Sequence, residues 1–264
     1  MEAGTLVTRV AVLRAPGTNC DRETARALRE AGGIVEVVRV SDLEAGIVDL
    51  SRFAGVVLPG GFSYADRVRA GAVLAAKLRT SLRDTIEEMR SRGRPVLGIC
   101  NGFQVLVELG VLPGIDGCRA ALAPNSSARF EFRWIHVRRV GRCRLSAGPD
   151  VQPMPVAHGE GKVVFSDPRC VEELESAGLV AYKYSMPDGT PAGGTYPYNP
   201  NGSEADIAGL CSPDGDVLGL MPHPERAIYD WQVPPALGSA SGISIFRAFV
   251  EVASGSMRHL VALD

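Results

Sequence analysis

Residues 95–102 read Pro95-Val96-Leu97-Gly98-Ile99-Cys100-Asn101-Gly102, a short apolar run that ends in a cysteine with a glycine two residues away on each side. The run 95–99 predicts a buried strand, and residues 101–109 predict a helix. Glycines on both sides relieve the backbone crowding that a sharp strand-to-helix turn creates. A thiol at the start of a helix faces the positive end of the helix dipole, which favours the reactive thiolate. We therefore interpret this stretch as a nucleophile elbow carrying Cys100, and not as a small buried cysteine.

The residues before the elbow alternate short β-rich runs with helical patterns, which is typical of a parallel sheet covered on both faces. The predicted strands before the elbow are 10–13, 34–40 and 55–58, and the first predicted helix is 21–31. The second half of the chain differs. Its sequence pattern predicts an antiparallel strand near 130–134 that is bulged close to Ile135. Further along, the pattern predicts a hairpin of 207–211 with 217–221 and a last helix over 243–252.

These patterns together predict an α/β protein with a single domain over residues 1–264. We expect a flavodoxin-like, mostly parallel sheet with helices on both faces and an antiparallel extension in the second half. A length of 264 residues and a hydrophobic content of 45% are consistent with one large core.

The overall charge and the apolar runs exclude several classes of partner. A net charge of −2 gives no reason to expect a nucleic-acid or membrane partner. No apolar run approaches the length that crosses a bilayer, and the amino terminus lacks the pattern of a secretion signal, so we expect a cytoplasmic protein. The 6 cysteines include no C-x-x-C pair, which argues against a zinc site and a redox dithiol. We expect most of them to be free thiols.

A thiolate nucleophile needs a base, and one of the 4 histidines has a convincing setting for that role. In Met221-Pro222-His223-Pro224-Glu225 each proline biases the preceding residue toward extended geometry. Side chains two apart on an extended segment point the same way, which predicts that His223 and Glu225 lie side by side. A carboxylate beside an imidazole fixes its tautomer, so Cys100, His223 and Glu225 form a complete triad by chemistry. His158 lies between glycines in Ala157-His158-Gly159, and its role stays open.

Acyl chemistry at a thiolate also needs hydrogen-bond donors for the developing oxyanion. Pro59-Gly60-Gly61 follows a predicted buried strand, and ligands collect at the carboxyl edge of such sheets. We predict that Gly60, Gly61 and the backbone N–H of Asn101 supply these donors.

The ordered motifs resemble the class I (triad) glutamine amidotransferases over almost the whole chain. The resemblance is strongest to the glutaminase subunits that serve purine biosynthesis. It is carried by six blocks, namely residues 15–24, 59–66, 100–104, 157–161, 199–203 and 220–226. The resemblance implies that Cys100 is the nucleophile, His223 the acid and base, and Glu225 its partner. It also implies that Gly60, Gly61, Asn101 and Gln104 contact the substrate glutamine. From the scattered cysteines we expect no metal site in this chain.

The same resemblance implies how the activity is used. The chain would hydrolyse the side-chain amide of glutamine through a cysteine thioester and pass ammonia to a large ATP-dependent synthetase subunit. A small accessory subunit would complete that carbon–nitrogen ligase, which converts formylglycinamide ribonucleotide to formylglycinamidine ribonucleotide. ATP and Mg²⁺ would bind the synthetase, because this chain has no G-x-x-x-x-G-K-[ST] loop and its Gly159-Glu160-Gly161-Lys162 is too short to be one.

Three alternatives remain open at this point. The chain could serve a different ammonia-using synthetase, which the triad alone does not exclude. It could be a stand-alone cysteine hydrolase on the same fold. It could also be a binding or redox-sensing module that performs no turnover, against which the presence of both His223 and Glu225 argues.

Overall fold

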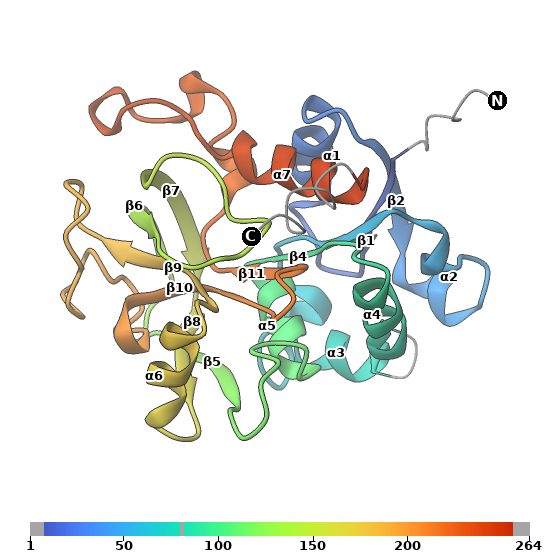
Figure 1. Cartoon of the computed structure of the whole chain (residues 1–264), viewed down its shortest axis with the longest axis horizontal. Helices are drawn as coiled ribbons and strands as arrows, with labels where there is room; N and C mark the ends of the chain where they lie inside the picture. Colours follow the sequence, from blue (N-terminus) through green and yellow to red (C-terminus); the bar gives the residue numbers. More distant parts are fainter. Residues whose placement is uncertain (1–7, 80–81, 256–264) are drawn as a thin grey trace.

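A nine-stranded sheet forms the centre of the molecule, in a computed structural model that describes residues 8–79 and 82–255 (Figure 1). Its strand order is β2-β1-β3-β4-β11-β10-β9-β6-β7. These strands are β1 (Arg9–Arg14), β2 (Ile34–Arg39), β3 (Gly55–Leu58), β4 (Val96–Ile99), β6 (Glu131–Arg139), β7 (Val151–His158), β9 (Val180–Ser185), β10 (Ile207–Cys211) and β11 (Val217–Leu220). A separate two-stranded sheet pairs β5 (Ala120–Pro124) with β8 (Glu160–Phe165).

The sheet is parallel in one half and antiparallel in the other. Strands β2, β1, β3, β4 and β11 pair in parallel, whereas β10, β9, β6 and β7 continue the sheet with antiparallel pairs. The helices are α1 (Asp21–Glu30), α2 (Val40–Glu44), α3 (Ala72–Leu78), α4 (Leu82–Ser91), α5 (Asn101–Glu108), α6 (Arg169–Ser176) and α7 (Ile243–Ala253). Helices α1 and α7 lie on one face of the parallel half and α3, α4 and α5 on the other (Figure 1). The predicted fold class is therefore confirmed.

The central strands are buried along their whole length. Every residue of β3, β4 and β11 is buried, because helices cover both faces of the parallel half. Strands β3 and β4 run side by side in the same direction and end at Leu58 and Ile99. The loop that starts at Pro59 and the turn at Cys100 therefore meet at the same edge of the sheet, where ligands of such folds bind.

The predicted bulge near Ile135 is wrong. Strand β6 pairs with β7 in unbroken register from Glu131 opposite His158 to Arg138 opposite Val151. Phe132 is 72% exposed, whereas Ile135 is 3% exposed. The hydrophobic pattern changes near Ile135 because the early aromatic residues lie on the outer face and the later aliphatic residues on the inner face, with no extra residue between them.

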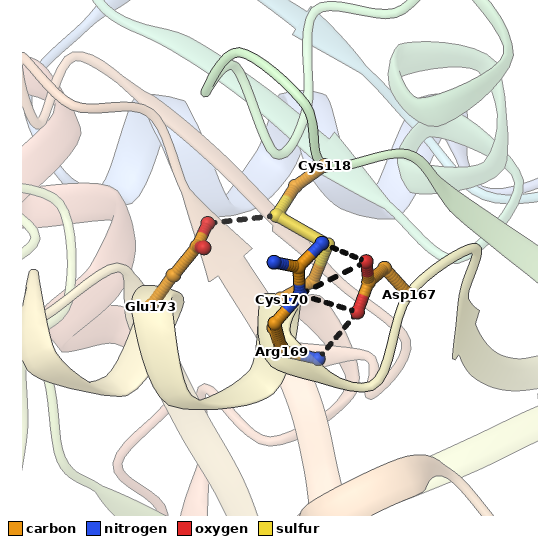
Figure 2. Close-up of a disulfide and its surroundings, with 5 residues drawn as sticks. All are labelled: Cys118, Asp167, Arg169, Cys170 and Glu173. Carbon is orange, nitrogen blue, oxygen red and sulfur yellow. Dashed lines mark hydrogen bonds and ion pairs between the residues drawn. A yellow bond between two sulfur atoms is a disulfide. The ribbon is translucent and has the colours of Figure 1, made fainter.

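One disulfide joins two segments that are 52 residues apart in sequence. Cys118, in the loop after α5, pairs with Cys170 on α6 (Figure 2). Glu173 on the same helix lies 3.3 Å from the Cys118 sulfur, and Arg169 pairs with Asp167 beside it. The sequence did not predict this pairing. The four other cysteines, Cys20, Cys100, Cys143 and Cys211, are free thiols, and all four are buried. Most of the cysteines are therefore free, as the sequence predicted.

Across the described residues, the helices are too short or too polar for any of them to traverse a lipid bilayer.

Candidate active site

The predicted elbow is present at Cys100. Strand β4 ends at Ile99 and α5 begins at Asn101, and Cys100 between them has φ 50° and ψ −105°. This conformation is costly for a residue with a side chain and is typical of a nucleophile elbow. The flanking glycines are required by close packing: a Cβ on Gly102 would lie 1.9 Å from the carbonyl oxygen of Leu58 on β3, and one on Gly98 would lie 2.6 Å from Leu106 Cδ1.

The Cys100 side chain is held in a defined position next to the antiparallel half of the sheet. Its backbone N–H donates to the carbonyl of Leu220 on β11 at 2.8 Å. Its sulfur lies 3.7 Å from the carbonyl oxygen of Ala157 on β7. The residue is only 4% exposed, so a substrate must enter a pocket to reach the sulfur.

His223 and Glu225 meet as predicted, but the local geometry is not the predicted one. Residues Pro224–Arg226 form a 3₁₀ turn with His223 at its start, so the expectation of a continuous extended segment is wrong. The turn nevertheless brings Nδ1 of His223 to 2.6 Å from Oε1 of Glu225. The backbone N–H of His223 donates to the carbonyl of Pro155 at 2.9 Å, which ties the turn to β7.

The surroundings of His223 favour its charged form. Burial by itself opposes a charge on this imidazole, but the Glu225 carboxylate and the Cys100 thiol outweigh burial, so the pKa of His223 lies well above its usual value. Within residues 8–79 and 82–255, Nε2 of His223 has no hydrogen-bond partner. That nitrogen is therefore the one available for proton exchange with a ligand.

Cys100 and His223 line the same pocket. This pocket, which we call the imidazole pocket, has a volume of about 190 Å³ and is also lined by Cys20, Phe62 and Arg226. The structure thus brings together the predicted nucleophile and the predicted base from β4 and from the turn after β11.

The two glycines after β3 lie against this group. A Cβ on Gly60 would come within 2.8 Å of His223 Cε1 and 3.4 Å of Cys100 Cβ. Gly61 has φ 147°, and a Cβ there would lie 2.8 Å from backbone atoms of both Thr18 and Asn19. Asn101 is the first residue of α5, where backbone N–H groups have no partner within the helix. Gly61 lines both pockets that Cys100 borders, so all three predicted donor residues lie close to Cys100.

Gln104 lines a second pocket, which Cys100 also borders. This pocket, which we call the acidic pocket, has a volume of about 180 Å³ and is lined by Asp66, Cys100, His158 and Glu160 among others. The Gln104 amide donates to the backbone carbonyl of Glu160 at 2.6 Å and accepts from the Asn101 side chain at 2.9 Å. Cys100 borders both pockets, so a molecule reacting at its sulfur can extend into the acidic pocket.

Sequence reasoning missed Cys20, which lies in the imidazole pocket. Its sulfur is 4.0 Å from Nδ1 of His223 and 3.1 Å from Nη2 of Arg226. Burial raises the pKa of the Cys20 thiol to about 11, so it stays protonated at neutral pH. Asn19-Cys20-Asp21 lies in the first of the six blocks and was the available signal.

Cys20, His223 and Glu225 carry atoms of the kind that bind metal ions, and these atoms lie close together. Among the described residues, only Cys20, His223 and Glu225 place such atoms within 4.8 Å of one another. The Arg226 guanidinium lies next to the Cys20 sulfur, and its positive charge opposes a cation there. The cluster is better described as a hydrogen-bonded group than as a metal site.

His158 is a buried neutral imidazole at the end of β7. Asn125 donates its amide N–H groups to the carbonyls of Arg129 and His158, so its oxygen accepts from His158 Nδ1 at 3.1 Å. Burial lowers the pKa of His158 to about 3. Its Nε2 therefore carries a lone pair, and this atom lacks a partner among the described residues.

The sequence matches the family model of the CobB/CobQ-like glutamine amidotransferase domain over residues 7–251. The chain belongs to this family of glutamine amidotransferases. The predicted family is therefore confirmed.

Several relatives resemble the chain over most of its length. It is 43% identical to the phosphoribosylformylglycinamidine synthase subunit PurQ of Archaeoglobus fulgidus, over 92% of this chain and 96% of that protein. It is 42% identical to the protein of the same name from Pyrococcus furiosus, over 91% of this chain and 96% of that one. A chain in the solved structure of PurLQS from Thermotoga maritima aligns with a TM-score of 0.70 and 31% identity, covering 93% of this amidotransferase and 99% of that chain.

Proposed function

We propose that this amidotransferase is the glutaminase subunit of a phosphoribosylformylglycinamidine synthase and that Cys100, His223 and Glu225 are its catalytic residues. One observation carries the proposal: the elbow thiol of Cys100 shares a pocket with the buried imidazole of His223, whose Nδ1 lies 2.6 Å from Glu225. The identity of 43% with PurQ of Archaeoglobus fulgidus supports the choice of synthase.

The chemistry follows from the positions of these groups. The Cys100 thiolate attacks the carboxamide carbon of glutamine, and the carbonyl oxygen becomes an oxyanion near the N–H groups of Gly60, Gly61 and Asn101. Protonated His223 gives its Nε2 proton to the departing nitrogen, which leaves as ammonia while the thioester forms. Neutral His223 then takes a proton from water, and the resulting hydroxide adds to the thioester carbon. The carbon–sulfur bond breaks, which releases glutamate and returns Cys100 to the thiolate and His223 to its protonated form.

The ammonia has to reach an acceptor before bulk water protonates it. We assign the acceptor to a synthetase subunit that binds ATP and Mg²⁺ and converts formylglycinamide ribonucleotide to formylglycinamidine ribonucleotide, together with a small accessory subunit. The resemblance to a chain of the Thermotoga PurLQS structure supports such an assembly.

The decisive experiment follows the amide nitrogen of glutamine. The chain is mixed with its synthetase, ATP, formylglycinamide ribonucleotide and glutamine labelled with ¹⁵N in the side chain. We expect the label in formylglycinamidine ribonucleotide. Cys100→Ala should abolish this transfer, and added ammonium chloride should restore unlabelled product, because the synthetase is intact.

Three results would contradict the proposal. Label in a different product would favour an amidotransferase of another synthetase. Ammonia release by Cys100→Ala at the rate of the parent would remove Cys100 from the reaction. Glutaminase activity that does not respond to any added synthetase would favour a stand-alone hydrolase.

A further inference from the structure

Two carboxylates line the acidic pocket next to Cys100. Asp66 belongs to the 3₁₀ segment Ser63–Asp66 after β3, and Glu160 is the first residue of β8. No lysine or arginine is among the described residues that line this pocket. His158 also lines it and is neutral, because burial lowers its pKa to about 3. The pocket therefore presents negative charge and no positive charge.

The positions of both carboxylates are fixed by their surroundings. Oε2 of Glu160 accepts the backbone N–H of Ala70 at 3.0 Å. Oδ1 of Asp66 lies 3.5 Å from the side-chain nitrogen of Asn101 on α5. Asp66 has φ 50°, and the two residues before it, Tyr64 and Ala65, also have positive φ. Three successive non-glycine residues in this conformation are costly and are found mainly where function requires the geometry.

The electrostatics of the pocket favour a cationic ligand. Burial and the negative charge of Glu160 raise the pKa of Asp66 to about 6. A positive group between the two carboxylates would relieve both the burial cost and the mutual repulsion. Nε2 of His158, which is buried and has no partner among the described residues, offers a further acceptor at the same pocket.

We propose that Asp66 and Glu160 bind the α-ammonium group of glutamine while its carboxamide lies at the sulfur of Cys100. This inference rests on the proposed glutaminase function and assigns two residues that select the substrate. Because Cys100 borders both pockets, the reacting end of glutamine lies at the sulfur and its amino-acid end extends into the acidic pocket. The site would then reject amides that lack a free amino group.

The first test compares two substrates with the parent chain in complex with its synthetase. L-Glutamine and 4-carbamoylbutanoate have the same carboxamide and carboxylate, but the second lacks the α-ammonium group. Loss of charged hydrogen bonds predicts that kcat/KM for 4-carbamoylbutanoate is about 100-fold lower. Ammonia release reports both reactions.

The second test uses variants that remove one charge and keep the side-chain shape. Asp66→Asn and Glu160→Gln should each raise the KM for glutamine about 10-fold to 100-fold and leave kcat/KM for 4-carbamoylbutanoate unchanged. Glu172→Gln on the exposed face of α6 is the matched control and should change neither value.

The pH dependence of KM provides a further readout. Asp66 is charged above its pKa of about 6. The KM for glutamine should therefore rise as the pH falls below about 6 in the parent and change less in Asp66→Asn. The groups that face Asp66 are Glu160 from β8, His158 from β7, and Cys100 and Asn101 at the start of α5.

The remaining outcomes of these tests would overturn either the ammonium site or the proposed glutaminase function. Equal hydrolysis of both substrates by the parent would overturn the ammonium site and leave the glutaminase function intact. The ammonium site would also be overturned if kcat/KM fell equally for both substrates in the variants, or if the variants kept the parent's ratio of kcat/KM between the two substrates. If the parent hydrolysed neither substrate, the proposed function itself would fail. The substrate comparison needs no variant, so it decides even if a substitution prevents folding.

Discussion

Oε1 of Glu225 lies 2.6 Å from Nδ1 of His223, and the two residues are 1% and 2% exposed. A carboxylate at Nδ1 fixes the imidazole tautomer and stabilises the imidazolium, which leaves Nε2 to exchange protons. Since Nε2 has no partner among the described residues, the pair is arranged to act on a group that enters from outside.

Glu225→Gln tests this relationship. The amide can still contact Nδ1 but carries no charge, so the imidazolium loses its stabilisation. We expect kcat for ammonia release to fall roughly 10²-fold to 10⁴-fold with little change in KM for glutamine. Glu30→Gln, an exposed carboxylate on α1, is the control. A kcat like that of the parent would show that Glu225 does not support His223.

Gly60→Ala tests how closely the loop after β3 approaches the base. The new methyl group would lie 2.8 Å from His223 Cε1 and 3.1 Å from the Cys20 sulfur, so the imidazole must move. We expect kcat to fall about 100-fold, because small displacements of a catalytic group are costly. Steady-state kinetics with the synthetase present measure this loss, and thermal unfolding checks the fold. An unchanged kcat would mean that the imidazole does not need its observed position.

His158 should make the stability of the protein depend on pH. Its folded pKa is about 3, whereas the ordinary value is about 6.5. Between these values the unfolded chain binds a proton that the folded chain does not, so the free energy of unfolding falls as the pH falls through this range. The slope from this one group is at most about 1.4 kcal/mol per pH unit.

His158→Gln removes the titration and keeps a donor for Asn125. Urea unfolding of both proteins at several pH values between 7 and 4 measures the effect. The difference in unfolding free energy between parent and variant should shrink as the pH falls. A constant difference would contradict a buried neutral His158.

The Cys118–Cys170 disulfide should stabilise the folded chain. It closes a loop of 52 residues, for which the loss of unfolded-chain entropy predicts about 4 kcal/mol. Cys118→Ser should lower the unfolding free energy by up to this amount. A reductant should destabilise the parent and leave the variant unchanged, and equal sensitivity of the two proteins would argue against the bond.

Local patterns were sufficient for the parallel half and the elbow. The run 95–99 is apolar because β4 is buried on both faces, and the glycines around Cys100 follow from a contact between α5 and β3. Predicted and observed bounds differ by at most one residue at either end of these elements. The type of each side chain and its spacing along the chain carried this information.

The site itself depends on residues far apart in sequence. Cys20 lies 203 residues from His223 and contacts it, and Asp66 meets Glu160 only because the loop after β3 reaches the start of β8. The turn at Pro224 replaces the extended segment that the prolines predicted, and a backbone hydrogen bond ties His223 to β7.

The sequence by itself determined the fold class, the elbow at Cys100 and the pairing of His223 with Glu225, since these follow from short-range periodicity and from residue type. Only the tertiary structure decided which face of β6 is buried, which cysteines pair, and that two carboxylates share a pocket with the thiol. Such contacts depend on the packing of strands and loops that are distant in sequence. The local sequence around one residue of such a pair therefore does not indicate which residue it will contact.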